Sequence, residues 1–447
     1  LNQTMNKGAY LLNYVGHGSP YRLGHEYFFT FDDAASWRNL RTLPVLVAAS
    51  CFFASADWEG DFPLGQSMLF MPQGGSIALI AASRLTFNYS NQVFNAHLLR
   101  AIFPKTESAQ NRALGDALRI AKNKTPGSEN RSKYLLLGNP ALPLPNFTAS
   151  AKLSTWNERA LGGIHDTLRA GEPLTLGIEV KHADGTPFTG ELNLQLFGPK
   201  RKVRTQDNDG EGVFEFEERV NTVFRGKATV ANGQAMVKLI VPTDMELDYG
   251  AGLVSLLATS NDALASGGYD SFVVGGRTAK SSDDTEGPEM EISWNDYAQR
   301  PQAVVSSNAL LIVRLRDTSG INISGAGVGH DLLATLSGNG KEERIVLNDF
   351  YTADIDSYRR GEVRYHFTNL APGKYTLRVQ AYDVYNNASQ RTISFEVGEP
   401  KQAQISNLLN YPNPFTGATS FYFDATRPGQ PVEVLIQIYT PDDILVR

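Results

Sequence analysis

The sequence predicts a multidomain protein in which an α/β domain with a parallel-sheet core is followed by β-sandwich domains. Two apolar runs of strand length, rich in β-branched residues, lie in the first part of the chain and flank a segment of helical periodicity. From about residue 150 that periodicity disappears, and short alternating runs separated by turn dipeptides take its place. The length of 447 residues suggests three or four domains.

The two apolar runs are Asn13–Pro20 and Leu43–Cys51, and they stop at chemically capable residues, His17 and Cys51. Between them, Phe31–Arg41 has an aspartate at the predicted N-cap, apolar residues at helical spacing and arginine in its last turn, which predicts a helix. A right-handed crossover makes two such strands parallel neighbours, so both carboxyl ends lie on one edge of the sheet. Open α/β sheets place their sites at this edge, and we expect His17 and Cys51 to meet there.

A thiol beside an imidazole is the pair that nucleophilic catalysis by cysteine needs. The thiolate is the nucleophile, and a nearby imidazole such as His17 can take the proton of Cys51. Gly16 and Gly18 flank His17 and let the backbone turn sharply, and the N–H groups of Gly18 and Cys51 are candidates for an oxyanion hole. His25 is a rival base, but it lacks the strand-end placement and the flanking glycines.

A lone cysteine at the end of an apolar run is also consistent with a small buried hydrophobe. The paired strand ends, the two glycines and the absence of any other cysteine favour the catalytic interpretation of Cys51. With one cysteine, the chain forms no intramolecular disulfide, and its folding depends on packed cores.

The segment after Cys51 is predicted to line a substrate cleft, because loops at the carboxyl ends of strands border such sites. Trp58 would offer a stacking wall and Asp57 part of an acidic rim, whereas the alternative is a solvated loop with one anchoring aromatic ring. Gly75–Ala82 predicts another buried parallel strand, followed by Arg84, which could hold a substrate carboxylate or pair with a local acid. Helices are expected at residues 63–71, 90–103 and 107–122.

Charge and composition exclude some classes of function. The net charge is −6 and the isoelectric point is about 5.7, so the chain has no basic footprint for nucleic acid and no nucleic-acid partner is expected. No run approaches the 18 or so apolar residues of a membrane helix, and no signal peptide opens the chain. Because Leu1 is not an initiator methionine, we expect a processed piece or a fragment.

The change of pattern along the chain predicts the domain order. We expect the α/β domain over residues 1–149, a β-sandwich over 150–276, a polar linker over 277–287, an immunoglobulin-like β-sandwich over 288–398 and a partial, truncated β domain over 399–447.

No cofactor is required by these patterns and no metal is expected in the catalytic site, but structural calcium is an open alternative in the β domains. Asp207, Asp209 and Glu211 could recruit calcium, although a hairpin turn explains them better. The acids around Asp349, Asp354 and Asp356 offer the same choice, with a solvated loop favoured over an ion site.

A family resemblance rests on Asn13–Pro20 followed by Ala49–Cys51. This combination resembles the His-Gly and strand-end Cys motifs of gingipain-type cysteine peptidases (family C25), whose catalytic domain is caspase-like. Tyr134–Leu142 resembles the segment that closes that domain, so the resemblance covers roughly the first 145 residues. It implies that Cys51 is the nucleophile and His17 the general base. Such domains carry further strands and an orienting carboxylate ahead of the His-Gly motif, which we expect upstream of Leu1.

Within this family, the trailing β domains and the tail beginning at Asn410–Phe415 resemble the sortases of type IX secretion systems. The resemblance implies an enzyme at the outer-membrane surface of the cell that removes the C-terminal sorting domain of secreted cargo through a Cys51 thioester. It further implies a porin-like shuttle or anchor partner and an amine acceptor on anionic lipopolysaccharide. A secreted endopeptidase with water as acceptor and a non-enzymatic surface adhesin or shuttle are the alternatives. The residues do not decide between amine and water.

Overall fold

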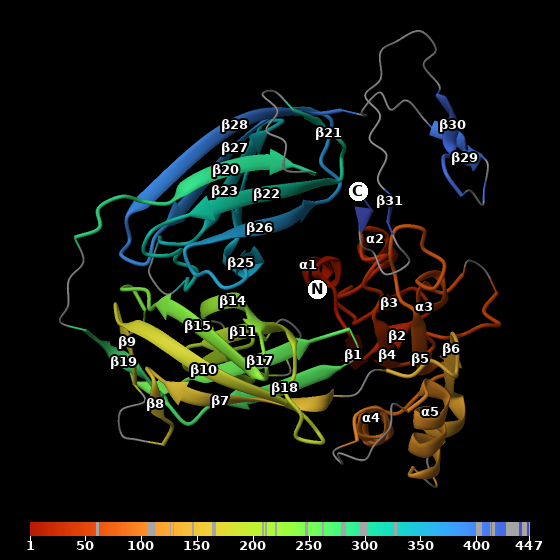
Figure 1. Cartoon of the computed structure of the whole chain (residues 1–447). Helices are drawn as coiled ribbons and strands as arrows, with labels where there is room; N and C mark the ends of the chain where they lie inside the picture. The colour runs from red at the N-terminus through yellow and green to blue at the C-terminus, as the bar shows by residue number, and fades with distance from the viewer. Residues whose placement is uncertain are drawn as a thin grey trace.

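The computed structural model describes all residues except 60–61, 105–111, 126, 128, 145–146, 163–166, 208–209, 211, 220, 246–248, 262, 279–282, 296–302, 326–328, 399–404, 412, 414–415, 426–437, 440–444 and 447. Figure 1 shows an N-terminal α/β domain, two β-sandwiches stacked beside it, and a short β segment near the C-terminus. The chain is therefore multidomain, as predicted. None of the described helices is long and apolar enough to cross a membrane.

The α/β domain is built on a four-stranded sheet. Its order is β1-β4-β5-β6, with β1–β4 and β4–β5 parallel and β6 antiparallel to β5. The strands are β1 (Leu11–Val15), β4 (Val45–Ala49), β5 (Ala78–Ala82) and β6 (Tyr134–Leu137). The parallel pairing of the first two apolar runs and the buried strand before Arg84 are thus confirmed.

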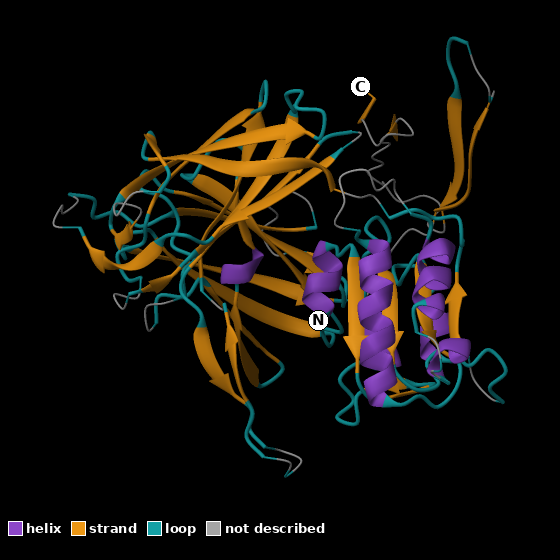
Figure 2. Ribbon diagram, turned by 90° about the horizontal axis from the view of Figure 1, so that it is seen from below, coloured by secondary structure: helices purple, strands orange, loops and turns teal. Residues whose placement is uncertain are grey.

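Helices cover both faces of this sheet (Figure 2). The side chains of β4 alternate between the faces: Val45 and Val47 pack with α4 and α5, whereas Leu46 packs with α1, α2 and α3. Burial on both faces explains why β4 and β5 are continuous apolar runs. The helices are α1 (Asn2–Lys7), α2 (Phe31–Ala35), α3 (Leu64–Ser67), α4 (Asn88–Ile102), α5 (Leu114–Asn123) and α6 (Asn130–Lys133).

The helix between β1 and β4 is shorter than predicted, and its N-cap is not an aspartate. Thr30 is the N-cap: its side chain accepts a hydrogen bond from the Asp33 N–H, while Asp33 Oδ2 accepts one from the Thr30 N–H at 2.8 Å, forming a capping box. The helix stops at Ala35 because Trp37 turns into the core, where its ring lies 5.1 Å from that of Phe29. Similarly, α3 ends at Ser67 rather than residue 71.

The first β-sandwich contains a large curved sheet of order β14-β11-β17-β18-β7-β10-β15, with β8 beside β7, a small sheet β16-β19-β9 and a hairpin β12-β13. Buried and less buried residues alternate along β10 and β11, as expected for strands with one face on a core. The strands are β7 (Phe147–Trp156), β8 (Arg159–Ala160), β9 (Thr167–Ala170), β10 (Pro173–His182), β11 (Gly190–Phe197), β12 (Arg201–Arg204), β13 (Glu215–Glu218), β14 (Thr222–Val230), β15 (Gln234–Ile240), β16 (Gly250–Ala251), β17 (Leu253–Thr259), β18 (Leu264–Tyr269) and β19 (Val273–Arg277).

The second sandwich packs a sheet of order β20-β22-β26-β25 against one of order β21-β28-β27-β23-β24. Its elements are β20 (Glu289–Trp294), β21 (Val304–Val305), β22 (Ala309–Arg316), β23 (Leu333–Gly338), β24 (Lys341–Val346), the 3-10 helix η1 (Asn348–Phe350), β25 (Tyr351–Ala353), β26 (Arg360–Phe367), β27 (Gly373–Tyr382) and β28 (Ala388–Val397). The C-terminal segment contributes two short hairpins, β29 (Ile405–Tyr411) with β30 (Ser420–Ala425) and β31 (Ile438–Tyr439) with β32 (Leu445–Val446).

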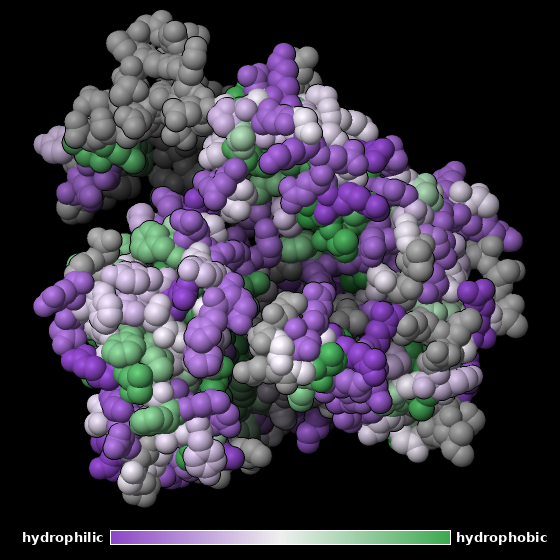
Figure 3. All heavy atoms as spheres, turned by 180° about the vertical axis from the view of Figure 1, so that it is seen from behind, coloured by the Kyte–Doolittle hydropathy of each residue, from purple (hydrophilic) through white to green (hydrophobic). Residues whose placement is uncertain are grey.

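The α/β domain and the two sandwiches meet around a hollow that is visible from behind (Figure 3). A cavity of about 940 Å³ is lined by the end of α1 and by strands of both sandwiches. The sandwiches are joined there by Arg225, which donates to the backbone oxygen of Asp349, and the Gln3 side chain of α1 donates to the backbone oxygen of His366 at 3.0 Å.

Candidate active site

The register of β1 and β4 brings the two predicted catalytic residues to one edge of the sheet. Val15 is paired with Ala49, so His17 and Cys51 each lie two residues beyond the last paired position. The Gly16 N–H extends the pairing by donating to the Ala49 carbonyl oxygen at 3.3 Å. His17 and Cys51 therefore follow the carboxyl ends of two neighbouring strands, on one edge of the sheet.

The backbone at His17 is held by two hydrogen bonds. Its carbonyl oxygen accepts from the Tyr14 hydroxyl at 2.8 Å and from the Gly24 N–H at 2.9 Å. The second bond closes a small hairpin of β2 (Gly18–Ser19) and β3 (Arg22–Leu23), which the sequence did not indicate. Gly18 packs so tightly on the neighbouring strand end that an added Cβ would lie 2.6 Å from Ser50 Oγ, so a side chain is excluded there.

His25, the alternative candidate for the general base, lies directly beside His17. The two rings are stacked, with centroids 4.2 Å apart and planes inclined by 18°, and both residues are exposed. The sequence placed His25 only close along the chain. The hairpin that follows Gly18 is what folds the two rings together.

Cys51 sits at a sharp turn and its sulfur contacts Thr86. The next residue, Phe52, has a φ of 57°, a left-handed conformation that is unfavourable for a bulky side chain. Cys51 itself is half-buried. Its Sγ atom lies 3.3 Å from the Thr86 backbone nitrogen, which donates to it, and 3.5 Å from both Thr86 Oγ1 and the Thr86 carbonyl oxygen. Sequence patterns did not indicate this contact, because Thr86 lies 35 residues further along the chain.

The predicted cleft residues are at the same edge. Trp58 Nε1 donates to the Tyr21 hydroxyl at 2.8 Å, and its ring also stands edge-on to Phe52 at 6.0 Å, so a wall of aromatic rings borders the turn at Cys51. Asp57 and Arg84 form a bidentate ion pair, with N–O distances of 3.0 and 2.7 Å. Arg84 therefore pairs with a local acid, and its hydrogen bond to Asp57 holds the pKa of that exposed carboxyl below its usual value.

The acids suggested as calcium ligands have other roles where the structure describes them. Asp349 pairs with Arg225 at 3.4 Å, Asp354 with Arg360 at 3.1 Å, and Asp356 accepts from the Thr229 N–H and hydroxyl at 2.8 and 2.6 Å. These carboxylates therefore bind other protein groups, and Asp349 and Asp356 contact the first sandwich. Asp207 accepts from the Gly212 N–H at 2.6 Å, as in a hairpin turn, while Asp209 and Glu211 lie outside the described residues.

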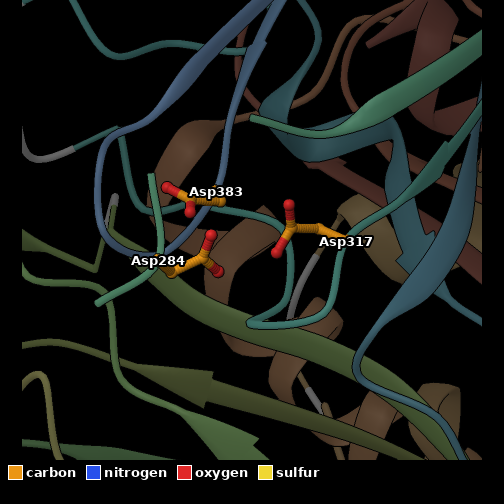
Figure 4. Close-up of side chains that lie close together, drawn as sticks. All are labelled: Asp284, Asp317 and Asp383. Carbon is orange, nitrogen blue, oxygen red and sulfur yellow. The ribbon is translucent and has the colours of Figure 1, made fainter. Parts of the chain in front are cut away.

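Among the described residues, one group of acids could hold a metal ion: Asp284, Asp317 and Asp383, in the loops at one end of the second sandwich. Their carboxylates point toward one another (Figure 4), with an oxygen of each within 4.8 Å of the others. Carboxylate oxygens are the ligands that Ca²⁺ prefers. Burial raises the pKa of Asp317 to about 6, and it also raises the pKa of Asp383. This group lies in the second sandwich, away from Cys51.

Asp317→Asn is expected to stabilise the second sandwich at neutral pH in buffer with a chelator. The folded chain holds a proton on Asp317 up to about pH 6, whereas an unfolded chain releases it at about pH 4, so ionisation between these values lowers the free energy of unfolding. The amide cannot ionise. We therefore expect the free energy of unfolding of the variant, measured against that of the parent, to be higher by about 1 kcal/mol at pH 7.5 than at pH 4.5.

Differential scanning calorimetry at the two pH values measures this gain. Asp184→Asn is the matched control, because hydrogen bonds from Thr186 lower the pKa of that carboxyl and predict the opposite sign. If the stability of the parent and that of Asp317→Asn depend equally on pH, ionisation of the buried Asp317 does not destabilise the folded chain.

The comparisons with known proteins address the same parts of the chain. Residues 1–145 match the model of peptidase family C25, and residues 344–398 match that of the Y_Y_Y domain. Among curated proteins the chain has no match.

The solved structures to which the chain is similar include the following two. Dimeric latent PorU from Porphyromonas gingivalis is 26% identical, with 84% of this chain and 36% of that chain covered and a TM-score of 0.36. Gingipain R, an Arg-specific cysteine proteinase, is 15% identical, with 61% and 54% covered and a TM-score of 0.30. The chain thus spans 36% of the PorU chain. The resemblance that the His-Gly and strand-end Cys motifs indicated is confirmed: residues 1–145 are similar to the peptidases of family C25.

Proposed function

We propose that Cys51 is the nucleophile and His17 the general base of a cysteine peptidase that works as a cell-surface sortase. The observation that supports the catalytic part is the register of β1 and β4, because it leaves His17 and Cys51 each two residues beyond the same paired position, within the residues that match the C25 peptidase model. Together they supply the nucleophile and the proton carrier that acyl transfer needs.

The reaction follows from these two groups. His17 takes the proton of Cys51, and the thiolate attacks the carbonyl carbon of the scissile peptide bond. When the tetrahedral intermediate collapses, the C–N bond breaks, His17 gives its proton to the leaving amine, and a thioester remains on Cys51. An incoming amine then attacks the thioester while His17 takes its proton, which forms a new amide and returns the thiol.

The Gly18 and Cys51 N–H groups form the oxyanion hole in this proposal. The Gly24 N–H bonds to the His17 carbonyl, and because bonded and non-bonded pairs alternate in an antiparallel ladder, the Gly18 N–H points away from β3. Gly18 also packs on Ser50, directly before Cys51, which keeps the two N–H groups close.

The sortase part rests on the resemblance of the β domains and of the tail at Asn410–Phe415 to type IX sortases. In this proposal the substrates are secreted cargo proteins with a C-terminal sorting domain, the acceptor is an amine on anionic lipopolysaccharide, and a porin-like outer-membrane protein is the partner. The second sandwich, which we infer to be immunoglobulin-like, and its neighbour would position the carrier of the acceptor. A secreted endopeptidase that uses water is the second candidate, and a non-enzymatic adhesin is the third.

The products distinguish these candidates. The full-length protein is incubated with cargo bearing its sorting domain and with increasing concentrations of a primary amine, and mass spectrometry identifies the new terminus of the cargo. A sortase yields cargo joined to the amine, in rising proportion. A free carboxylate at every amine concentration would refute the sortase and leave the endopeptidase, and uncut cargo would favour the adhesin.

A further inference from the structure

Thr86 is the residue whose polar groups surround the sulfur of Cys51. It lies in the loop between β5 and α4, and it offers three atoms to Sγ: the backbone N–H at 3.3 Å, the hydroxyl oxygen at 3.5 Å and the carbonyl oxygen at 3.5 Å. Thr86 is itself buried, with 8% of its surface exposed. The contact is therefore shielded from bulk water, and a hydrogen bond to a charged group is stronger in such a place than in water.

These three atoms suit both protonation states of the sulfur. The thiol can donate its hydrogen to the Thr86 carbonyl oxygen, whereas the thiolate, which has no hydrogen, can only accept from the N–H and the hydroxyl. The hydroxyl is set to donate, because its oxygen already accepts a hydrogen bond from Asn91 Nδ2 at 2.9 Å. Two donors on a single residue thus face the thiolate.

Asn91, on α4, fixes the Thr86 hydroxyl to the end of the strand that carries Cys51. Its Nδ2 donates both to Thr86 Oγ1 and to the Ala49 carbonyl oxygen, at 3.2 Å. Its Oδ1 accepts from the Tyr134 hydroxyl at 2.7 Å and from Asn130 Nδ2 at 2.9 Å. Asn91 is 3% exposed, and its amide has a partner for each of these donors and acceptors.

Asn130, on α6, fixes the backbone that follows Thr86. Its Oδ1 accepts from the Phe87 N–H at 3.1 Å, and its Nδ2 donates to the Phe87 carbonyl oxygen at 2.8 Å. Asn130 and Tyr134 are both fully buried, and the Tyr134 ring is stacked on Phe94 of α4. Buried polar groups cost stability unless each is paired, so a paired set of this kind holds one geometry.

We propose that Thr86 is a catalytic residue that stabilises the Cys51 thiolate, and that Asn91, Asn130 and Tyr134 are positioning residues that keep its hydroxyl directed at the sulfur. This inference rests on the proposed role of Cys51 as a nucleophile. It adds to the imidazole a second source of thiolate stabilisation, which uses neutral donors from the loop that leads into α4.

Other ionisable groups also face this part of the domain, and the test has to separate them from Thr86. His17 stands at the neighbouring strand end with His25 stacked on it. Tyr134 stays neutral, because burial and the nearby Cys51 raise its pKa. The Arg84–Asp57 ion pair begins two residues before Thr86. A Thr86 variant leaves all of these side chains in place.

The test is the pH dependence of Cys51 alkylation by iodoacetamide in this chain. Cys51 is the only cysteine, so the rate reports on this sulfur alone. Thr86→Val keeps the shape and the backbone N–H but removes the hydroxyl, and we expect the midpoint of the rate profile to rise by about one pH unit, a tenfold smaller thiolate fraction below the midpoint. Thr86→Ser restores the hydroxyl and should return the midpoint to that of the parent, which a merely structural role of the side chain does not predict.

Tyr134→Phe provides a second variant in case Thr86→Val does not fold, as judged by circular dichroism. It removes one donor to Asn91 and should shift the midpoint in the same direction by a smaller amount. An unchanged midpoint in the folded variants would overturn the inference. If only His17→Ala shifts the profile, Thr86 is excluded while the proposed function stands; if the parent reacts like a model thiol and His17→Ala changes nothing, the proposed function itself fails.

Discussion

Cys51→Ala is expected to abolish peptide-bond cleavage by the full-length protein, with a loss of about a thousandfold or more. The proposed reaction passes through a bond to Sγ, and alanine has no atom that can form it. The fold should survive, because the substitution removes only the Sγ contacts with Thr86. Position 51 lies beyond the paired part of β4, which an alanine there would leave unchanged. The rate of cargo cleavage, measured beside circular dichroism spectra, checks both statements.

Ser132→Ala is a suitable control for this variant. It also removes one side-chain heavy atom, and Ser132 donates to the Glu129 carbonyl on the exposed side of α6. We expect it to cleave like the parent. Cleavage by folded Cys51→Ala at the parent rate would show that another residue is the nucleophile.

His17→Ala should lower the rate of cleavage by about a hundred- to ten-thousandfold, the usual contribution of a general acid–base group. The same variant should slow alkylation of Cys51 near neutral pH, because the thiol loses the imidazole that takes its proton. Both effects depend on His17 standing at the strand end beside the one that carries Cys51.

His25→Ala is the matched comparison, because its ring is stacked on that of His17 and the substitution is the same. It removes the stacking partner but leaves the imidazole at the strand end, so we expect less than a tenfold loss of cleavage. A larger loss in His25→Ala than in His17→Ala would assign the general base to His25 and contradict the present assignment.

Much of the α/β domain could be predicted from the sequence because its two central strands, β4 and β5, are buried on both faces. Val45–Ala49 and Ala78–Ala82 are apolar without interruption, and such runs show as strands in any local window. The short helix before β4 was less predictable. Its end depends on Trp37 reaching Phe29 in the core, and Thr30 competes with the aspartates for the cap through a bond to Asp33.

Some residues of the candidate site could likewise be predicted from the sequence, and others could not. His17, Gly18 and Cys51 stand out because each lies at the end of an apolar run. Thr86 and Asn130 do not, because their role comes from contacts across the fold: Thr86 meets Cys51 over 35 residues, and Asn130 meets Asn91 over 39. No spacing rule connects residues so far apart in sequence.

Electrostatic pairs could not be predicted either. The Asp57–Arg84 ion pair joins two loops 27 residues apart, and only the choice between a substrate and a local acid could be stated beforehand for Arg84. The group Asp284, Asp317 and Asp383 was not foreseen, since three loops of the second sandwich bring these carboxylates together. Loop placement depends on the packing of the sheets, which local sequence patterns do not report.

Trapping the acyl-enzyme tests the central assignment most directly. The full-length protein is mixed with cargo, quenched with acid within its first turnover, and its mass is measured before and after treatment with hydroxylamine, which cleaves thioesters. We predict an adduct of the mass of the cargo fragment on the peptide containing Cys51, released by hydroxylamine and missing in Cys51→Ala and in His17→Ala. Cleavage that proceeds without any adduct on Cys51, or with the adduct on another residue, would contradict the assignment.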